Sequence, residues 1–137
     1  MSALARGPRP LRLRLAAQSL PARLRDVRAQ VARWAGRLGL PADAVDDIVL
    51  ATREALANVA DHAYPDGDGD AELDAACVQG EVRVVVRDHG SWRAPANDPG
   101  WRGRGLVLIA GLAEHVDVHR APAGTSIAMT WSLPRAP

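Results

Sequence analysis

The chain has 137 residues, of which 47% are hydrophobic and 24% are charged, and its formal net charge at pH 7 is +1. This length fits one domain that buries a core without disulfides or structural metal, and the balanced charge gives no argument for nucleic-acid binding. The uncharged, apolar stretch Gly105–Ala113 is far shorter than the roughly 20 residues that cross a bilayer, and the longest uncharged stretch, Ala121–Pro134, is also too short. A single cysteine and the absence of an apolar leader fit a reducing, cytoplasmic setting.

The N-terminal part of the sequence predicts a strand followed by two helices. Residues 11–15, LRLRL, alternate between leucine and arginine, which is typical of a strand with one buried face. Apolar residues then recur at intervals of three or four from about residue 20 to residue 38, which predicts the first helix. A second helical pattern covers about residues 41–59 and cannot continue through Pro65.

Beyond Pro65 the pattern changes to strands. Two β-rich runs joined at Gln79 and Gly80 predict a hairpin, and the irregular segment after it is long enough to be functional. A short third helix and two closing strands complete the chain. The predicted ranges are 71–78 and 81–88 for the hairpin, 89–102 for the irregular segment, 103–114 for the helix, and 115–120 and 125–133 for the closing strands.

This order of elements predicts an α+β fold. Strands and helices in this succession favour a two-layer sandwich, in which the helices pack on one face of a mixed, mostly antiparallel sheet. We expect a single domain over residues 11–133, with a loose tail at residues 1–10 and a short one at residues 134–137.

The second predicted helix carries an unusual polar stripe. Glu54 and Asn58 lie four residues apart, and together with Asp47 and His62 they follow one line along the border of the buried face. A carboxylate and an amide oxygen at this spacing suit a hard cation such as Mg²⁺ with a water beside it. From the helix alone, however, a solvated polar face with a helix-stabilising pair is the favoured interpretation.

Three later motifs, taken together with the motif on this helix, favour a functional site over a solvated polar face. The sequence reads ExxxNxxxHAY at residues 54–64, DxG at 88–90, GRGL at 103–106 and GT at 124–125. This series resembles the N box, G1 box, G2 box and closing GT of the ATPase superfamily that contains DNA gyrase, the Hsp90 chaperones, histidine kinases and mismatch-repair ATPases. Within that superfamily the small size, the HAY ending and the short G2 box resemble the serine kinases that act as bacterial anti-sigma factors. The resemblance implies a Bergerat-type ATP-binding fold.

The resemblance also implies a role for each box. Asn58 would be the protein ligand of Mg²⁺, and Glu54 would act as general base, the catalytic residue that takes a proton from the attacking hydroxyl. Asp88 would accept a hydrogen bond from the amino group of adenine, and Gly90 would let the backbone approach the ring.

The later boxes would surround the phosphates and the base. Glycines at the start of the third helix would expose backbone N–H groups to phosphate, and the neighbouring arginines would either add charge or remain solvated. The threonine of the GT pair would line the base pocket, or serve only as a strand residue. We therefore expect the cofactor-binding residues to be Asn58, Asp88, Gly90, Arg102, Gly103, Arg104, Gly105, Leu106 and Thr125.

The function implied by this resemblance is an ATP-dependent protein serine kinase with ATP and Mg²⁺ as cofactors. Such a protein sequesters a sigma factor, phosphorylates a serine of an anti-sigma-factor antagonist, commonly works as a homodimer, and has no direct nucleic-acid or membrane partner. Two departures keep a non-catalytic, nucleotide-gated regulator open as the alternative: Trp92 replaces the second glycine of the G1 box, and the chain has no lysine. A small ATPase or a sensor-kinase catalytic domain is less favoured.

Overall fold

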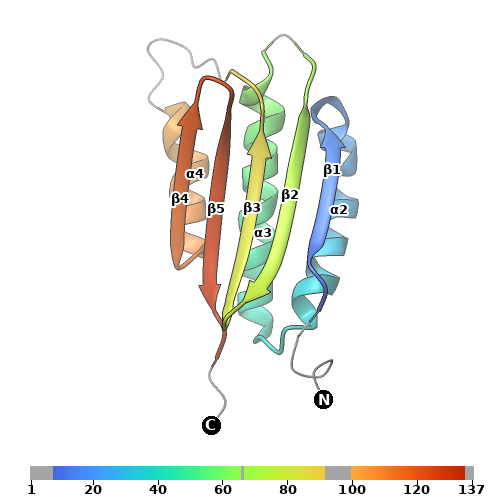
Figure 1. Ribbon diagram of the computed structural model, residues 1–137, viewed down its shortest axis with the longest axis vertical. Coiled ribbons are helices and arrows are strands. Elements are labelled where there is room, and N and C mark those ends of the chain that lie inside the picture. Colours follow the sequence, from blue (N-terminus) through green and yellow to red (C-terminus); the bar gives the residue numbers. More distant parts are fainter. Residues whose placement is uncertain (1–7, 66, 92–99, 135–137) are drawn as a thin grey trace.

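The computed structural model describes residues 8–65, 67–91 and 100–134, and for residues 100–104 it describes the backbone alone. These residues form a sheet covered on one face by helices (Figure 1). The elements in chain order are β1 (Leu11–Ala16), a 3-10 turn η1 (Ala17–Ser19), α2 (Leu20–Gly36), α3 (Ala42–Asn58), a π-helical turn η2 (Val59–Ala63), β2 (Asp70–Val78), β3 (Glu81–Asp88), α4 (Gly100–Leu112), β4 (His115–Ala121) and β5 (Gly124–Ser132).

The predicted two-layer α+β architecture is confirmed. The five strands lie in the order β1-β2-β3-β5-β4, and every pair of neighbours in the described part of the chain is antiparallel. The sheet is therefore simpler than the mixed one expected from the sequence. In Figure 1, α2, α3 and α4 lie side by side behind the sheet, with α3 in the middle.

Most predicted elements occur close to their expected positions. The hairpin turn falls on Gln79 and Gly80, which both have positive φ, of 52° and 77°, as a tight two-residue turn requires. The third helix was misplaced at both ends, since it begins at Gly100 and ends at Leu112. Glycine weakens helix interiors, yet Gly103 lies inside α4, because local propensity does not fix a helix boundary.

The core lies between α3 and the inner face of the sheet. Ala51 and Ala55 of α3 are fully buried, and their small side chains allow the helix to pack closely on the strands. Larger residues fill the spaces on either side of them. The fully buried partners on α3 and the inner strand faces are Ile48, Leu56, Leu73, Val82, Val84 and Met129.

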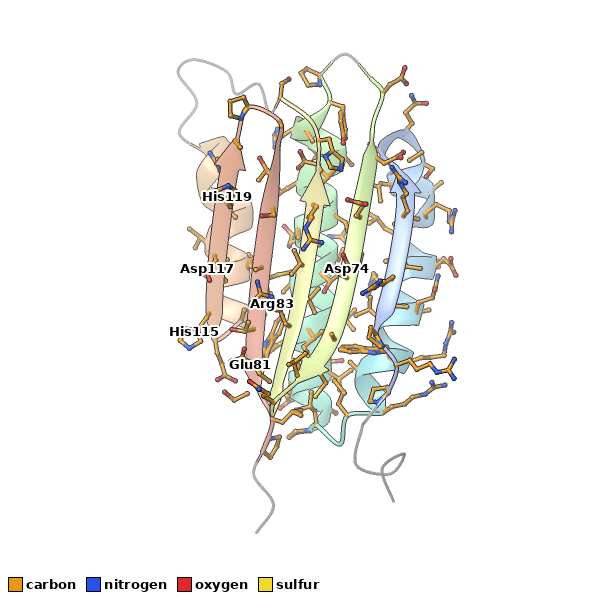
Figure 2. All side chains as sticks on the ribbon, viewed as in Figure 1. Asp74, Glu81, Arg83, His115, Asp117 and His119 are labelled. Carbon is orange, nitrogen blue, oxygen red and sulfur yellow. The ribbon has the colours of Figure 1, made fainter. Side chains whose placement is uncertain are left out.

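The outer face of the sheet is polar and open. Figure 2 shows Asp74, Arg83 and Asp117 on this face, on strands β2, β3 and β4. Arg87 binds Asp74 with an N–O distance of 2.7 Å, but these side chains are about 40% exposed, so the pair stabilises the fold by roughly 1 kcal/mol at most. Among the described residues, no helix has the length and apolar character needed to cross a membrane.

Candidate functional site

The predicted polar stripe of α3 lies at the border of the core, as its spacing requires. Glu54 and Asn58 are both half-buried, one helical turn apart, while Ala55 between them is fully buried. The backbone is therefore held rigidly while the two polar tips remain accessible. Arg53 lies beside Glu54, with 3.1 Å between its Nη1 atom and Oε2 of Glu54, and only 21% of the Glu54 side chain is exposed.

The side chain of Asn58 lies against α4, in the space that a side chain at residue 105 would occupy. A Cβ atom at Gly105 would lie 2.7 Å from both Nδ2 and Oδ1 of Asn58, closer than such atoms pack. An alanine there would therefore have to displace the end of the Asn58 side chain. Because α4 begins at Gly100, Gly105 lies in its second turn, and a regular helix pairs that amide with a carbonyl of the preceding turn. Gly103 lies in the first turn, whose N–H groups lack such partners.

Asp88 and Thr125 face each other at the adjoining ends of β3 and β5. They are register partners, and only 4% and 6% of their surfaces are exposed. Oδ1 of Asp88 accepts a hydrogen bond of 2.9 Å from the N–H of Gly90. Gly124, the first residue of the GT pair, packs so closely that a Cβ atom there would overlap the Asp88 carbonyl. The G1 box and the closing GT thus form one compact strand end.

Gly90 connects this strand end to the helix layer. A Cβ atom at Gly90 would overlap the carbonyl group of Ala63, the last residue of η2. Since η2 directly continues α3, the turn after Asp88 lies against the same helical segment that carries Glu54 and Asn58. The N box and the G1 box are therefore brought together.

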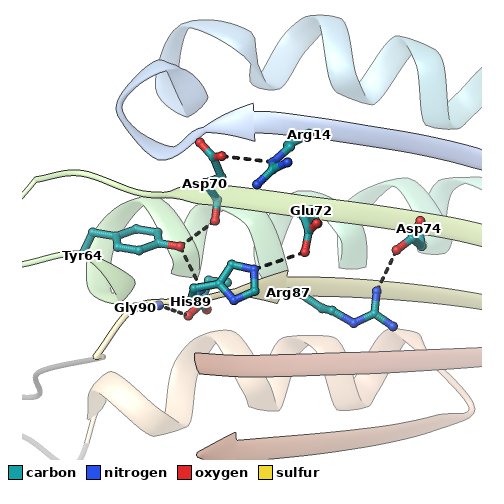
Figure 3. A network of polar contacts seen from close by, with 9 residues as sticks. Arg14, Tyr64, Asp70, Glu72, Asp74, Arg87, His89 and Gly90 are labelled. Atoms are coloured by element: carbon teal, nitrogen blue, oxygen red, sulfur yellow. Dashed lines mark hydrogen bonds and ion pairs between the residues drawn. The ribbon is translucent and has the colours of Figure 1, made fainter. Parts of the chain in front are cut away.

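Tyr64, which closes the ExxxNxxxHAY motif but has no assigned role in the sequence analysis, lies beside the site. Its hydroxyl lies 2.6 Å from the Asp70 carbonyl oxygen and 2.8 Å from the His89 backbone nitrogen (Figure 3). Burial is the main cause that raises the pKa of the Tyr64 hydroxyl above its ordinary value, so the group stays protonated. The hydrogen-bond partners of this tyrosine are backbone atoms, and a pattern of residue types does not predict contacts with backbone atoms.

The remaining predicted residues divide into two groups. Leu106 is half-buried and packs against the core, and His62 is half-buried within η2. The side chains of Arg102 and Arg104, and the whole of Trp92, lie outside the described residues. The roles predicted for these residues therefore remain predictions.

A magnesium ion fits the donor set of α3. Among the described residues, no group of three or more His, Cys, Asp or Glu side chains is placed to hold a metal ion by itself. Mg²⁺ is usually held by one or two protein oxygens together with waters and substrate phosphates. The half-buried amide oxygen of Asn58, one turn from the carboxylate of Glu54, is a suitable donor for that arrangement.

Comparisons with known proteins agree with this geometry. Residues 17–131 match the sequence profile described as the histidine kinase-like ATPase domain. The chain is 32% identical over 124 residues to the serine-protein kinase RsbW of Halalkalibacterium halodurans, covering 80% of this chain and 75% of that protein. Its fold is similar to a crystal structure of RsbU and RsbW domains from Mycobacterium tuberculosis, with a TM-score of 0.74 and 28% identity. That match covers 94% of this chain but 34% of the larger one.

Proposed function

Since the chain belongs to the histidine kinase-like ATPase domain family, and within it to the relatives of the serine-protein kinase RsbW, we propose that it is an anti-sigma-factor kinase. It binds ATP with Mg²⁺, sequesters a sigma factor, and transfers the γ-phosphoryl group to a serine of an antagonist protein. The setting we propose is the cytoplasm, and the protein works as a homodimer.

One observation carries this proposal. The side chain of Asn58 lies against Gly105, so the N box on α3 and the G2 box on α4 are in contact across residues that are distant in sequence. A plain solvated helix face does not require a glycine opposite its asparagine. The contact supports a shared site, because a metal ion bound by Asn58 and phosphates bound at the start of α4 must occupy neighbouring space.

Each polar residue then has a defined chemical task. The carboxylate of Glu54 takes the proton from the attacking serine hydroxyl, and Arg53 holds that carboxylate in place through its ion pair. Asn58 presents the oxygen that binds Mg²⁺. Bound ATP supplies the phosphoryl group, and the metal ion offsets the charge of its phosphates.

Other residues bind the adenine base and the phosphates. Asp88 accepts a hydrogen bond from the amino group of adenine, and its burial makes a base without that donor costly to bind. Thr125, its partner on β5, lines the same pocket with its hydroxyl. Gly103, with Arg102 and Arg104, lies at the start of α4 and contributes to phosphate binding.

The binding step is tested by calorimetric titration with ATP, with and without Mg²⁺. We expect the wild-type protein to bind, and Asn58→Ala to lose most of the Mg²⁺-dependent part of the affinity. A wild-type protein that binds no ATP under either condition would contradict the whole proposal.

The catalytic step is tested separately with radiolabelled ATP and the cognate antagonist. We expect phosphate transfer to a serine by the wild-type protein, and a loss of about 100-fold or more in Glu54→Ala, as removal of a general base produces. Equal transfer by Glu54→Ala would remove Glu54 as the base. ATP binding without any transfer would instead favour the nucleotide-gated regulator.

A further inference from the structure

The hydroxyl of Tyr64 bridges two strands at the end of the sheet that carries the site. It donates to the carbonyl oxygen of Asp70 at the start of β2, at 2.6 Å, and accepts the N–H of His89 directly after β3, at 2.8 Å. Figure 3 shows the tyrosine reaching from the end of η2 to both strands. One side chain thus joins the helix layer to two neighbouring strand ends.

The ring of Tyr64 is as firmly placed as its hydroxyl. A Cβ atom at Gly69 would overlap the ring, so the backbone of residue 69 lies directly against it. The carbonyl oxygen of Gly69 in turn accepts a hydrogen bond of 2.8 Å from the N–H of Ala17, which anchors that segment beside β1. The tyrosine is therefore clamped between backbone segments and has little freedom to move its hydroxyl.

The hydrogen bond to His89 acts on the turn that carries the base-binding carboxylate. Two consecutive N–H groups follow Asp88: that of His89 is bound by Tyr64, and that of Gly90 by the Asp88 carboxylate itself. Gly90 also rests on the carbonyl of Ala63, the neighbour of Tyr64. The conformation of the turn, and with it the direction of the carboxylate, is fixed from the end of η2.

A second contact supports the same turn from the outer face. Nε2 of His89 lies 3.3 Å from Oε1 of Glu72, although 61% of the histidine side chain is exposed. An exposed pair of this kind contributes little, so the inner tyrosine carries most of the restraint. The tyrosine is also the contact that reaches the backbone beside Asp88.

We propose that Tyr64 is a positioning residue that sets the selectivity of the site for adenine over guanine. By holding the His89 N–H, it keeps the Asp88 carboxylate directed at the exocyclic amino group of adenine. Guanine presents a carbonyl oxygen at that place, which a fixed carboxylate repels and a loosened one tolerates. This inference rests on the proposed binding of ATP at Asp88, and it adds the residue that makes the recognition strict.

The test is the ratio of ATP to GTP affinity in Tyr64→Phe, measured by calorimetry. Phenylalanine keeps the ring against Gly69 and removes only the hydroxyl. We expect ATP affinity to fall about five- to tenfold, as loss of one well-placed hydrogen bond predicts, while GTP affinity changes much less. The matched control is Trp34→Phe, which removes the bond from Nε1 to the Arg9 carbonyl oxygen, on a different part of the fold.

A second measurement reads the restraint without any nucleotide. Hydrogen exchange at the His89 amide should become about tenfold faster in Tyr64→Phe, while amides in the middle of β3 stay unchanged. An unchanged His89 amide, or an unchanged ratio of ATP to GTP affinity in a variant that still binds ATP, would overturn the role of Tyr64. Failure of the wild-type protein to bind ATP would overturn the proposed function as well, so the two failures are distinguishable.

Discussion

Gly105 of α4 lies directly against the side chain of Asn58 on α3. The distance from a Cβ atom at residue 105 to either polar atom of that side chain would be 2.7 Å, whereas ordinary contacts of this kind begin near 3.4 Å. The glycine therefore leaves room for the asparagine amide between the helix that would hold the metal and the helix that would hold the phosphates.

The substitution Gly105→Ala should reduce Mg²⁺-dependent ATP affinity by about tenfold or more. The added methyl group must displace the end of the Asn58 side chain, and loss of about 1.4 kcal/mol of interaction with the metal ion lowers the affinity tenfold. Calorimetric titration with ATP and Mg²⁺ measures the effect directly.

Gly111→Ala on the same helix is the matched control. A Cβ atom at Gly111 meets nothing within 4 Å, so this variant should bind ATP like the wild-type protein. It should also be more stable by about 0.5–1 kcal/mol, because alanine is the better helix former. Equal ATP affinity in the two alanine variants would show that the contact with Asn58 does not matter for binding.

The fold could be predicted from the sequence because its strands and helices have clear periods. LRLRL alternates as a strand with one buried face does, and Gly80 suits the positive φ of the second turn residue. The start of α4 was not predictable in the same way. Its glycines and apolar residues give no amphipathic pattern, so nothing local shows whether the helix begins at Gly100 or three residues later.

The site could be predicted only in part, for a physical reason. Glu54 and Asn58 share a helix, so their relative position follows from spacing alone. The pairing of Asp88 with Thr125 depends on β5 inserting between β3 and β4, which no local pattern specifies. The hydroxyl of Tyr64 contacts backbone atoms. Every residue has these atoms, so the sequence does not indicate which residues the tyrosine contacts.

The substitution Asp88→Asn should lower ATP affinity by about tenfold to 100-fold. An asparagine has nearly the same shape and can still accept the N–H of Gly90, but it loses the charge that strengthens a hydrogen bond to adenine. Competition with labelled ATP measures the loss.

Asp74→Asn supplies the control for charge alone. Asp74 is half-exposed on the outer face of the sheet, where it pairs with Arg87, so its loss should change stability by roughly 1 kcal/mol at most and ATP affinity not at all. If Asp74→Asn weakened ATP binding as much as Asp88→Asn, a general charge effect would replace the specific contact.

Cys77 should react slowly with iodoacetamide in the folded protein. Burial raises the pKa of this thiol above its ordinary value of 9.0, so less of it is present as the reactive thiolate near pH 8. Because it is the only cysteine in the chain, mass spectrometry gives its alkylation rate without ambiguity. The same protein in concentrated urea is the control and should react several times faster. Equal rates would show that the thiol is not shielded by β2 and its surroundings.

Tyr64 should make the folded protein less stable at alkaline pH. Its folded-state pKa is raised above the ordinary value of 10.0, chiefly by burial, so the unfolded chain releases the proton first as the pH rises. The unfolded state then binds fewer protons than the folded state, and the free energy of unfolding falls above about pH 10. Urea unfolding of the wild-type protein and Tyr64→Phe at a series of pH values measures this difference.

The phenylalanine variant isolates the contribution of this one group. Cys77 also has a raised pKa, so its ionisation lowers the free energy of unfolding in the same direction as that of Tyr64. Because Cys77 is present in both proteins, its contribution cancels in their difference. Tyr64 is the only tyrosine in the chain, so the ultraviolet absorbance of tyrosinate reports its ionisation directly. We expect the wild-type protein to lose stability more steeply than Tyr64→Phe once the pH exceeds about 10. Parallel curves, with tyrosinate appearing at its ordinary pKa, would mean that the hydroxyl is not held between Asp70 and His89 in solution.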